Sequence, residues 1–302
     1  MSQTPEDFLP RRYQVRHSTT YTYDGPVDTC YERGFLAPRD TPSQSVVSNR
    51  IDIDPEPDLV SEHHDHFGNR SFYVEVHSSH SRLQVTKTSV LDVDWPQPDI
   101  ERLNQWTVAT AAARIAAHAD PVERAEYGMS SPLVRLSPVV SQFAAGLIHP
   151  DMPLGEAIRA VTHGIFAGFA YEPGATTIAT TLPDLLELRA GVCQDFTHLA
   201  VGVLRSVGLP ARYVSGYLET APPPGKPKLE GADASHAWAS VMLPDGSWLD
   251  LDPTNDHFCD SRYVVTAWGR DFRDVSPLKG VIFADSVRSS MTVAVDVTRV
   301  PG

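Results

Sequence analysis

The chain has 302 residues, of which 41% are hydrophobic, enough for one large domain or two modest ones. Acidic residues number 38 against 25 basic ones, so the formal net charge is −13. A surface this acidic repels phosphate backbones, and we therefore expect no nucleic-acid partner.

The N-terminus is polar and acidic and lacks the basic and then apolar layout of a signal peptide. No run of about eighteen uncharged apolar residues occurs, so we expect no membrane-spanning segment and no membrane partner. Cys30, Cys193 and Cys259 are too few and too scattered for a disulfide framework. These features predict a cytoplasmic protein, and a reducing compartment would also keep a reactive thiol available.

Residues 1–97 are predicted to form a β-rich, sandwich-like domain. Several segments alternate apolar and polar residues, as half-buried strands do: 13–17, 73–76 and 83–93. Turn signals such as Asp24-Gly25-Pro26 and Phe67-Gly68-Asn69 separate these segments. The stretch 95–98, Trp-Pro-Gln-Pro, then interrupts the pattern, and we interpret it as a linker.

Residues 98–302 are predicted to form an α+β core. The hydrophobic period becomes helical over 102–117, 137–148 and 154–169. A further helix is expected to begin at the cap-like sequence Thr181-Leu182-Pro183-Asp184. Past Pro210 the pattern returns to strands, and we interpret the Pro-rich stretch 221–225 as a flap.

Cys193 stands at the start of an amphipathic helix. The apolar stripe of that helix comprises Phe196, Leu199, Ala200, Val203, Leu204 and Val207, and Gly208-Leu209-Pro210 ends it. First-turn N–H groups and the helix dipole favour a thiolate over a thiol, and the thiolate is the nucleophile. The alternative is an inert cysteine that packs as a small hydrophobic residue.

His236 and Asp252 are predicted to lie on neighbouring strands of a hairpin. If residues 244–246, Pro-Asp-Gly, form the loop, Trp238 faces Asp252 and His236 is its diagonal neighbour on the same face of the sheet. Diagonal positions are about 7–8 Å apart at the backbone, which suits an Asp–His hydrogen bond. A two-residue loop would instead put the two side chains on opposite faces.

The hairpin residues also have simpler interpretations. His236 could be an ordinary surface or core histidine, and Asp252 could merely begin a turn, because it precedes Pro253. A catalytic role is favoured by the combination of the three residues: a nucleophile at a helix start, a base on one strand and an orienting acid on the next strand.

Four segments in this order resemble the core of bacterial transglutaminase-like proteins. They are RAGVCQDF at 189–196, GLPARYVSGY at 208–217, DASHAW at 233–238 and DPTN at 252–255. The segment FAYEPG at 169–174 is also similar, and the β-rich start resembles the N-terminal region that those proteins usually carry. The resemblance spans most of the chain.

The resemblance implies a papain-like core, with a helix-borne cysteine and an antiparallel sheet that carries histidine and aspartate. It implies that Cys193, His236 and Asp252 form a catalytic triad that attacks an amide carbonyl and leaves a thioester. The backbone N–H of Cys193 is a natural oxyanion donor, and Tyr171 or Gln194 could supply a second.

The expected reaction is hydrolysis by a peptidase or amidase acting on a peptide, protein or other amide. The chain is short and lacks the calcium loop and the paired C-terminal β-barrels of animal tissue transglutaminases. Two alternatives stay open: cross-linking of the protein-glutamine γ-glutamyltransferase type to an amine, and a non-catalytic binding module on the same fold.

We expect no cofactor and no metal. Cys193 and His198 point about 140° apart around a helix and cannot grip one ion, and His257 and Cys259 lack a complementary pair nearby in sequence. The histidines at positions 63, 64 and 66 are expected to be loop residues rather than ligands.

Overall fold

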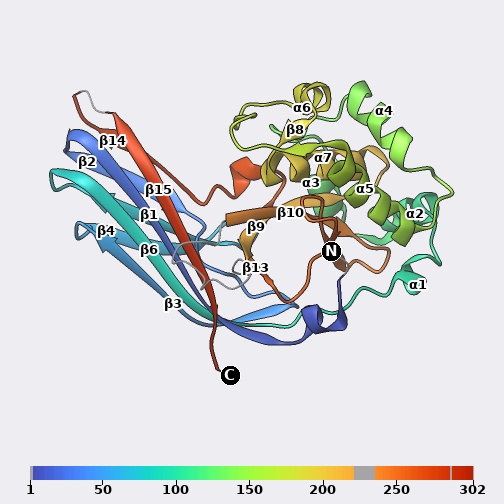
Figure 1. Ribbon diagram of the computed structural model, residues 1–302, viewed down its shortest axis with the longest axis horizontal. Helices are drawn as coiled ribbons and strands as arrows, with labels where there is room; N and C mark the ends of the chain where they lie inside the picture. The colour runs from blue at the N-terminus through green and yellow to red at the C-terminus, as the bar shows by residue number, and fades with distance from the viewer. Residues whose placement is uncertain (1–2, 221–234, 286–287, 302) are drawn as a thin grey trace, which may run out of the picture.

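A computed structural model describes residues 3–220, 235–285 and 288–301 of the chain. Figure 1 shows two lobes, one made of long strands and one of helices around a shorter sheet. The first is called the N-terminal lobe below, and the second the core lobe. The expected flap at 221–225 lies outside the described residues. Among the described residues, no helix is long and apolar enough to cross a membrane.

The N-terminal lobe consists, among the described residues, of two four-stranded antiparallel sheets in the orders β15-β1-β6-β3 and β14-β2-β5-β4. Apolar side chains from both sheets, including Leu83 and Phe72, form one buried cluster between them. This is the sandwich that the alternating pattern predicts. Its strands are β1 (Arg11–Val27), β2 (Thr29–Gly34), β3 (Gln44–Asp54), β4 (Leu59–His64), β5 (Arg70–Val76), β6 (His80–Val93), β14 (Leu278–Phe283) and β15 (Ser289–Arg299).

Two strands of this lobe come from the C-terminal end of the chain. β14 pairs with β2, and β15 pairs with β1 from Tyr13↔Arg299 to Tyr23↔Ser289. The structure therefore differs from the expected division at residue 97, which assigned the whole of 98–302 to the core. Pairing partners so far apart in sequence leave no local signal, so the pattern of these strands alone does not show which sheet they join.

Glu32 is a charged residue inside this sandwich. It is 3% exposed, and its Oε2 has no hydrogen-bond partner among the described residues. An ideal Cβ at Gly280, opposite it on β14, would lie 2.3 Å from the carboxyl group, so the absence of a side chain there makes room for Glu32. Burial raises the pKa of Glu32 to about 7.

Replacing Glu32 with glutamine is expected to make the protein more stable at neutral and alkaline pH, because a buried amide does not ionise as the Glu32 carboxyl does. The folded state binds this proton more tightly than the unfolded chain, so stability is highest below the ordinary pKa of 4.5 and falls as pH rises through about 7. The penalty reaches about 3 kcal/mol at pH 8. Thermal unfolding at pH 5 and pH 8 checks this: the Tm difference should shrink in E32Q, and an unchanged difference would contradict the assignment.

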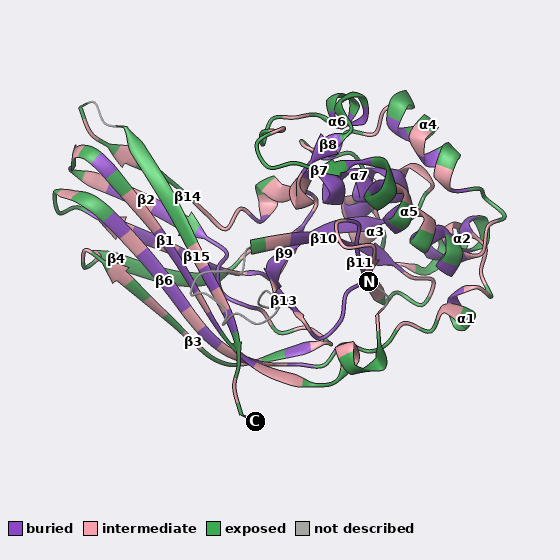
Figure 2. Cartoon of the chain, in the orientation of Figure 1, coloured by how far each residue is buried: buried purple, intermediate pink, exposed green. Residues whose placement is uncertain are grey.

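The core lobe packs its helices against one face of a sheet that, within the described part of the chain, has the order β12-β11-β10-β9-β13. The strands are β9 (Ala211–Leu218), β10 (Ser235–Met242), β11 (Trp248–Asp252), β12 (His257–Phe258) and β13 (Tyr263–Gly269). The helices are α1 (Ile100–Leu103), α2 (Val108–His118), α3 (Pro121–Gly128), α4 (Pro138–Leu147), α5 (Leu154–Gly168), α6 (Leu182–Leu188) and α7 (Cys193–Ser206). Figure 2 shows buried residues concentrated where α7 lies near β9 and β10.

The helix expected over 102–117 is in fact two helices. α1 ends at Leu103, and Thr107 caps α2, its hydroxyl accepting from the N–H of Thr110. A bridge between Thr107 and Pro153 holds the chain extended at this point. Cap chemistry and a tertiary contact thus outweigh the helical propensity of the segment.

The N-terminal lobe covers the other face and the free edge of the core sheet. Tyr13, Val15 and Trp95 pack in one cluster with Trp238 and Tyr263 of the core sheet.

Two side-chain amides then complete the edge strand β13. Gln44 exchanges two hydrogen bonds with the backbone of Val265, at 2.7 and 2.8 Å, and Asn69 does the same with Trp268, at 2.8 and 2.9 Å. The two lobes are therefore joined by apolar packing and by paired amides.

Candidate active site

Cys193 is the first residue of α7, as the apolar stripe predicts, and the helix is followed by Gly208 at φ +82°. Asp195 fixes the first turn: its Oδ2 accepts from the backbone N–H of Val192 at 2.9 Å and from the hydroxyl of Thr176 at 2.6 Å. An acidic side chain in the first turn complements the helix dipole. The thiol thus lies at the N-terminal end of α7, in a turn whose backbone is held in place.

The hairpin has the predicted register. Met242 pairs with Trp248 and Ala239 with Leu251, and the Leu243 N–H donates to the Ser247 carbonyl at 2.8 Å. The three-residue loop is therefore confirmed. It brings His236 Nε2 to 2.7 Å from Asp252 Oδ2.

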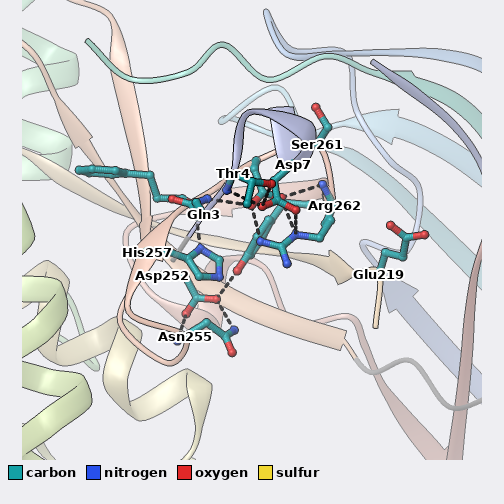
Figure 3. A network of polar contacts seen from close by, with 12 residues as sticks. Gln3, Thr4, Asp7, Glu219, Asp252, Asn255, His257, Ser261 and Arg262 are labelled. Carbon is teal, nitrogen blue, oxygen red and sulfur yellow. Dashed lines mark hydrogen bonds and ion pairs between the residues drawn. The ribbon is translucent and has the colours of Figure 1, made fainter. Parts of the chain in front are cut away.

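Asp252 is fully buried and accepts several hydrogen bonds. Its Oδ2 accepts from Asn255 Nδ2 at 2.7 Å (Figure 3). Oδ2 also accepts from the Tyr263 hydroxyl at 2.6 Å, and Oδ1 accepts from the Thr254 N–H at 2.8 Å. Burial raises the pKa of Asp252, but the charge of His236 and these hydrogen bonds outweigh it. That pKa is held well below its usual range, so the carboxylate stays charged.

His236 is bound by Asp252. Its Nε2 contacts the carboxylate at 2.7 Å, and the side chain of Cys193 influences the pKa of the imidazole. Burial lowers the pKa of His236, yet the charge and hydrogen bond of Asp252, together with Cys193, raise it to about 10. The imidazole can therefore take a proton from sulfur and keep it as a cation at neutral pH.

The other two cysteines are unsuited to nucleophilic chemistry. Cys30 and Cys259 are buried, and burial raises the pKa of Cys30 to about 11 and that of Cys259 well above its ordinary value. Cys193 is partly exposed. The three thiols differ in accessibility, which makes selective labelling of Cys193 feasible.

Tyr171 and Gln194, the two candidates for oxyanion or substrate contacts, both lie near Cys193 along the backbone: Tyr171 pairs with Gly191, and Gln194 follows Cys193 in α7. Tyr171 is in the short strand β7 (Ala170–Tyr171), which runs parallel to β8 (Ala190–Gly191), and it is 57% exposed. Burial and then the charge of Cys193 raise the pKa of Tyr171. Gln194 is the second residue of α7 and half-buried.

Sequence reasoning assigned no role to Tyr263 or Asn255. Asn255 belongs to the DPTN segment, but within that segment a role was predicted only for Asp252. Tyr263 begins an apolar strand and has the sequence signature of a packing residue. Only the fold brings its hydroxyl to Asp252.

Several histidines outside the hairpin have positions or partners away from Asp252. His63 and His64 lie in β4 rather than in a loop, and His66 pairs with Glu126 at 2.8 Å. His198 is buried on α7 and accepts from the Phe272 N–H at 3.2 Å. Among the described residues, no group of three His, Cys, Asp or Glu side chains could hold a metal ion.

A cavity of about 450 Å³ lies beside the turn that follows Asp252. Its walls include Arg159 and His163 of α5 together with Asp256 and Phe258. None of Cys193, His236 and Asp252 lines it, so this cavity does not coincide with the three candidate residues.

Comparisons with known proteins cover both lobes. The family model described as the bacterial transglutaminase-like N-terminal region matches residues 13–92, and that of the transglutaminase-like superfamily matches 141–253. An uncharacterized protein of Mycobacterium tuberculosis is 42% identical over 299 residues, covering 96% of this chain and 94% of the relative. A protein-glutamine γ-glutamyltransferase of Pseudomonas aeruginosa is 31% identical over 106 residues, covering 35% of this chain and 16% of the relative.

The fold is also found in a solved structure. A proposed cysteine protease from Cytophaga hutchinsonii superposes with a TM-score of 0.79 and 19% identity, over 97% of this chain and 92% of that chain. At this identity the likeness concerns the fold, and it extends through both lobes.

Proposed function

This chain belongs to the transglutaminase-like superfamily, and on that premise we propose that it is a thiol-dependent acyl-transfer enzyme with Cys193, His236 and Asp252 as its catalytic triad. The observation that carries the proposal is the contact of His236 Nε2 with Asp252 Oδ2 at 2.7 Å. This contact leaves the other ring nitrogen, Nδ1, available for the thiol of Cys193.

The reaction begins when Nδ1 of His236 accepts the thiol proton. The sulfur then attacks an amide carbonyl carbon, and the carbonyl oxygen becomes an oxyanion. The imidazolium returns its proton to the departing amine, which leaves a thioester on Cys193. Water then attacks the thioester while His236 accepts its proton, and the acid and the free thiol are released.

The oxyanion is stabilised at the start of α7. The first N–H groups of a helix have no partner within it, so the N–H of Cys193 is free to donate. Tyr171 or Gln194 supplies the second donor in this proposal, because Tyr171 pairs with Gly191, two residues before Cys193, and Gln194 directly follows Cys193.

Hydrolysis is the reaction we propose first, on a peptide, protein or other amide substrate. Water is always abundant, whereas transfer needs a second amine held near the thioester. Transfer to an amine is the second candidate, because part of the core matches a protein-glutamine γ-glutamyltransferase. We also propose a cytoplasmic location, since a reducing compartment keeps the Cys193 thiol available.

A product assay separates the two reactions. The enzyme is incubated with a peptide library and glutamine-containing casein, with and without a fluorescent alkylamine. We expect cleaved or deamidated products with little amine incorporation, and incorporation that exceeds hydrolysis would favour transfer. No product of either kind, together with an unreactive Cys193, would favour a non-catalytic binding module.

A further inference from the structure

We propose that Tyr263 is a positioning residue of this site: its hydroxyl holds the Asp252 carboxylate in the one orientation that keeps His236 Nε2 bound and Nδ1 free for sulfur. This inference rests on the proposed function, because it concerns the same three groups. It adds a fourth side chain, from a different strand, to the machinery.

The geometry concentrates three donors on a single oxygen. Asp252 Oδ2 accepts from Tyr263 at 2.6 Å, from His236 at 2.7 Å and from Asn255 Nδ2 at 2.7 Å. Tyr263 and Asp252 are both 0% exposed, so bulk water does not compete for these bonds.

The other carboxylate oxygen is bound as well. Oδ1 of Asp252 accepts from the backbone N–H groups of Thr254 at 2.8 Å and Asn255 at 3.3 Å. Any rotation of the carboxylate would break several hydrogen bonds in a buried site, where each unmade bond is expensive. The direction of the His236 bond is therefore fixed.

Tyr263 is itself held by the segment that joins the two lobes. Its carbonyl accepts from Trp95 Nε1 at 3.0 Å, and its ring lies edge-on to Trp238 at 5.2 Å between centroids. Its centroid is 6.1 Å from that of His236. The N-terminal lobe thereby contributes to the placement of the phenol, which in turn places the acid.

Several titratable groups of the described residues face this cluster. Cys193 faces it from α7, and the His257 ring of β12 lies edge-on to Tyr263 at 5.8 Å between centroids. Cys259, Asp260 and Arg262 lie near Tyr263 as well. Cys259 is neutral because burial raises its pKa, and Asp260 is paired with Arg262 (Figure 3). The Tyr263 hydroxyl is thus a neutral donor that shares the charge of Asp252 with His236.

Without the Tyr263 hydroxyl, the negative charge of the Asp252 carboxylate interacts more strongly with His236. The imidazolium then holds its proton more tightly and donates it less readily to the leaving amine. The carboxylate also gains freedom to turn. We therefore expect an effect on kcat and on the alkaline limb of the pH profile, with little effect on KM.

The test is Tyr263→Phe in the full-length protein, with Tyr217→Phe as the matched control. Tyr217 is a buried tyrosine of the same sheet, but its hydroxyl contacts His17 and the Leu36 carbonyl instead of a carboxylate. We expect Tyr263→Phe to lower kcat about tenfold and to move the alkaline limb about half a unit higher. Tyr217→Phe should change neither quantity.

Two outcomes overturn the inference. One is a wild-type kcat and pH profile in Tyr263→Phe; the other is a fall in kcat with an unmoved alkaline limb, as a purely structural role predicts. In both cases an inactive Cys193→Ala leaves the proposed function standing, whereas a fully active Cys193→Ala rejects that function instead. If Tyr263→Phe does not fold, 3-fluorotyrosine at position 263, a stronger donor of nearly the same shape, must move the limb to lower pH.

Discussion

Replacing Cys193 with alanine is expected to abolish turnover, with a loss on the order of 10⁴-fold or more, while the fold stays intact. The sulfur is the only group in the proposed mechanism that forms a covalent bond to the substrate. The side chain is small and partly exposed at the start of α7, so its removal leaves little cavity. Initial rates and near-ultraviolet circular dichroism measure the two effects separately.

A second cysteine supplies the control for this variant. Cys30 lies in the buried cluster of the N-terminal lobe, away from His236. Cys30→Ala should lower Tm and keep turnover, the reverse of Cys193→Ala. If Cys193→Ala retained more than about a tenth of the wild-type rate, the nucleophile would have to be sought elsewhere.

Removal of residues 1–97 is expected to unfold the remainder of the chain. The face of the core sheet that carries Trp238 and Tyr263 is buried by Tyr13, Val15 and Trp95. β14 and β15 would also lose their partners, β2 and β1. Each large apolar side chain exposed costs about 1.5–3 kcal/mol, and several together exceed a typical stability of about 5–15 kcal/mol.

The truncated chain 98–302 can be compared with full-length protein by soluble yield and thermal unfolding. We expect aggregation or a non-cooperative transition. Supplying residues 1–97 as a separate polypeptide should restore part of the soluble yield, because the two pieces share apolar and strand contacts. A soluble 98–302 with a cooperative transition and full activity would show that the core lobe is independent, contrary to this account.

Local patterns were sufficient for the elements that carry the candidate site. The start of α7 at Cys193 and the register that puts His236 beside Asp252 both depend on neighbours within a few residues, namely an apolar stripe and a Pro-Asp-Gly turn. The α+β core preceded by a β-rich region is likewise confirmed, by the family matches and the solved relative.

Contacts between distant segments could not be read in the same way. Nothing in the sequence of β15 indicates that it pairs with β1, whose residues are more than 250 positions away. The hydrogen bond from the Tyr263 hydroxyl to Asp252 could not be predicted from the sequence either, because a tyrosine at a strand start is usually a packing residue. Both features depend on contacts between strands that are not consecutive in the chain.

The most direct test of the central claim is the pH dependence of Cys193 alkylation by iodoacetamide, followed by mass spectrometry of each cysteine peptide. The account predicts rapid labelling of Cys193 at pH 6, where an ordinary thiol with a pKa of about 8.5 is almost fully protonated, and slow labelling of Cys30 and Cys259. It also predicts that His236→Ala removes the reaction at pH 6. Labelling of Cys193 that rises only near pH 8.5, alike in wild type and His236→Ala, would contradict it.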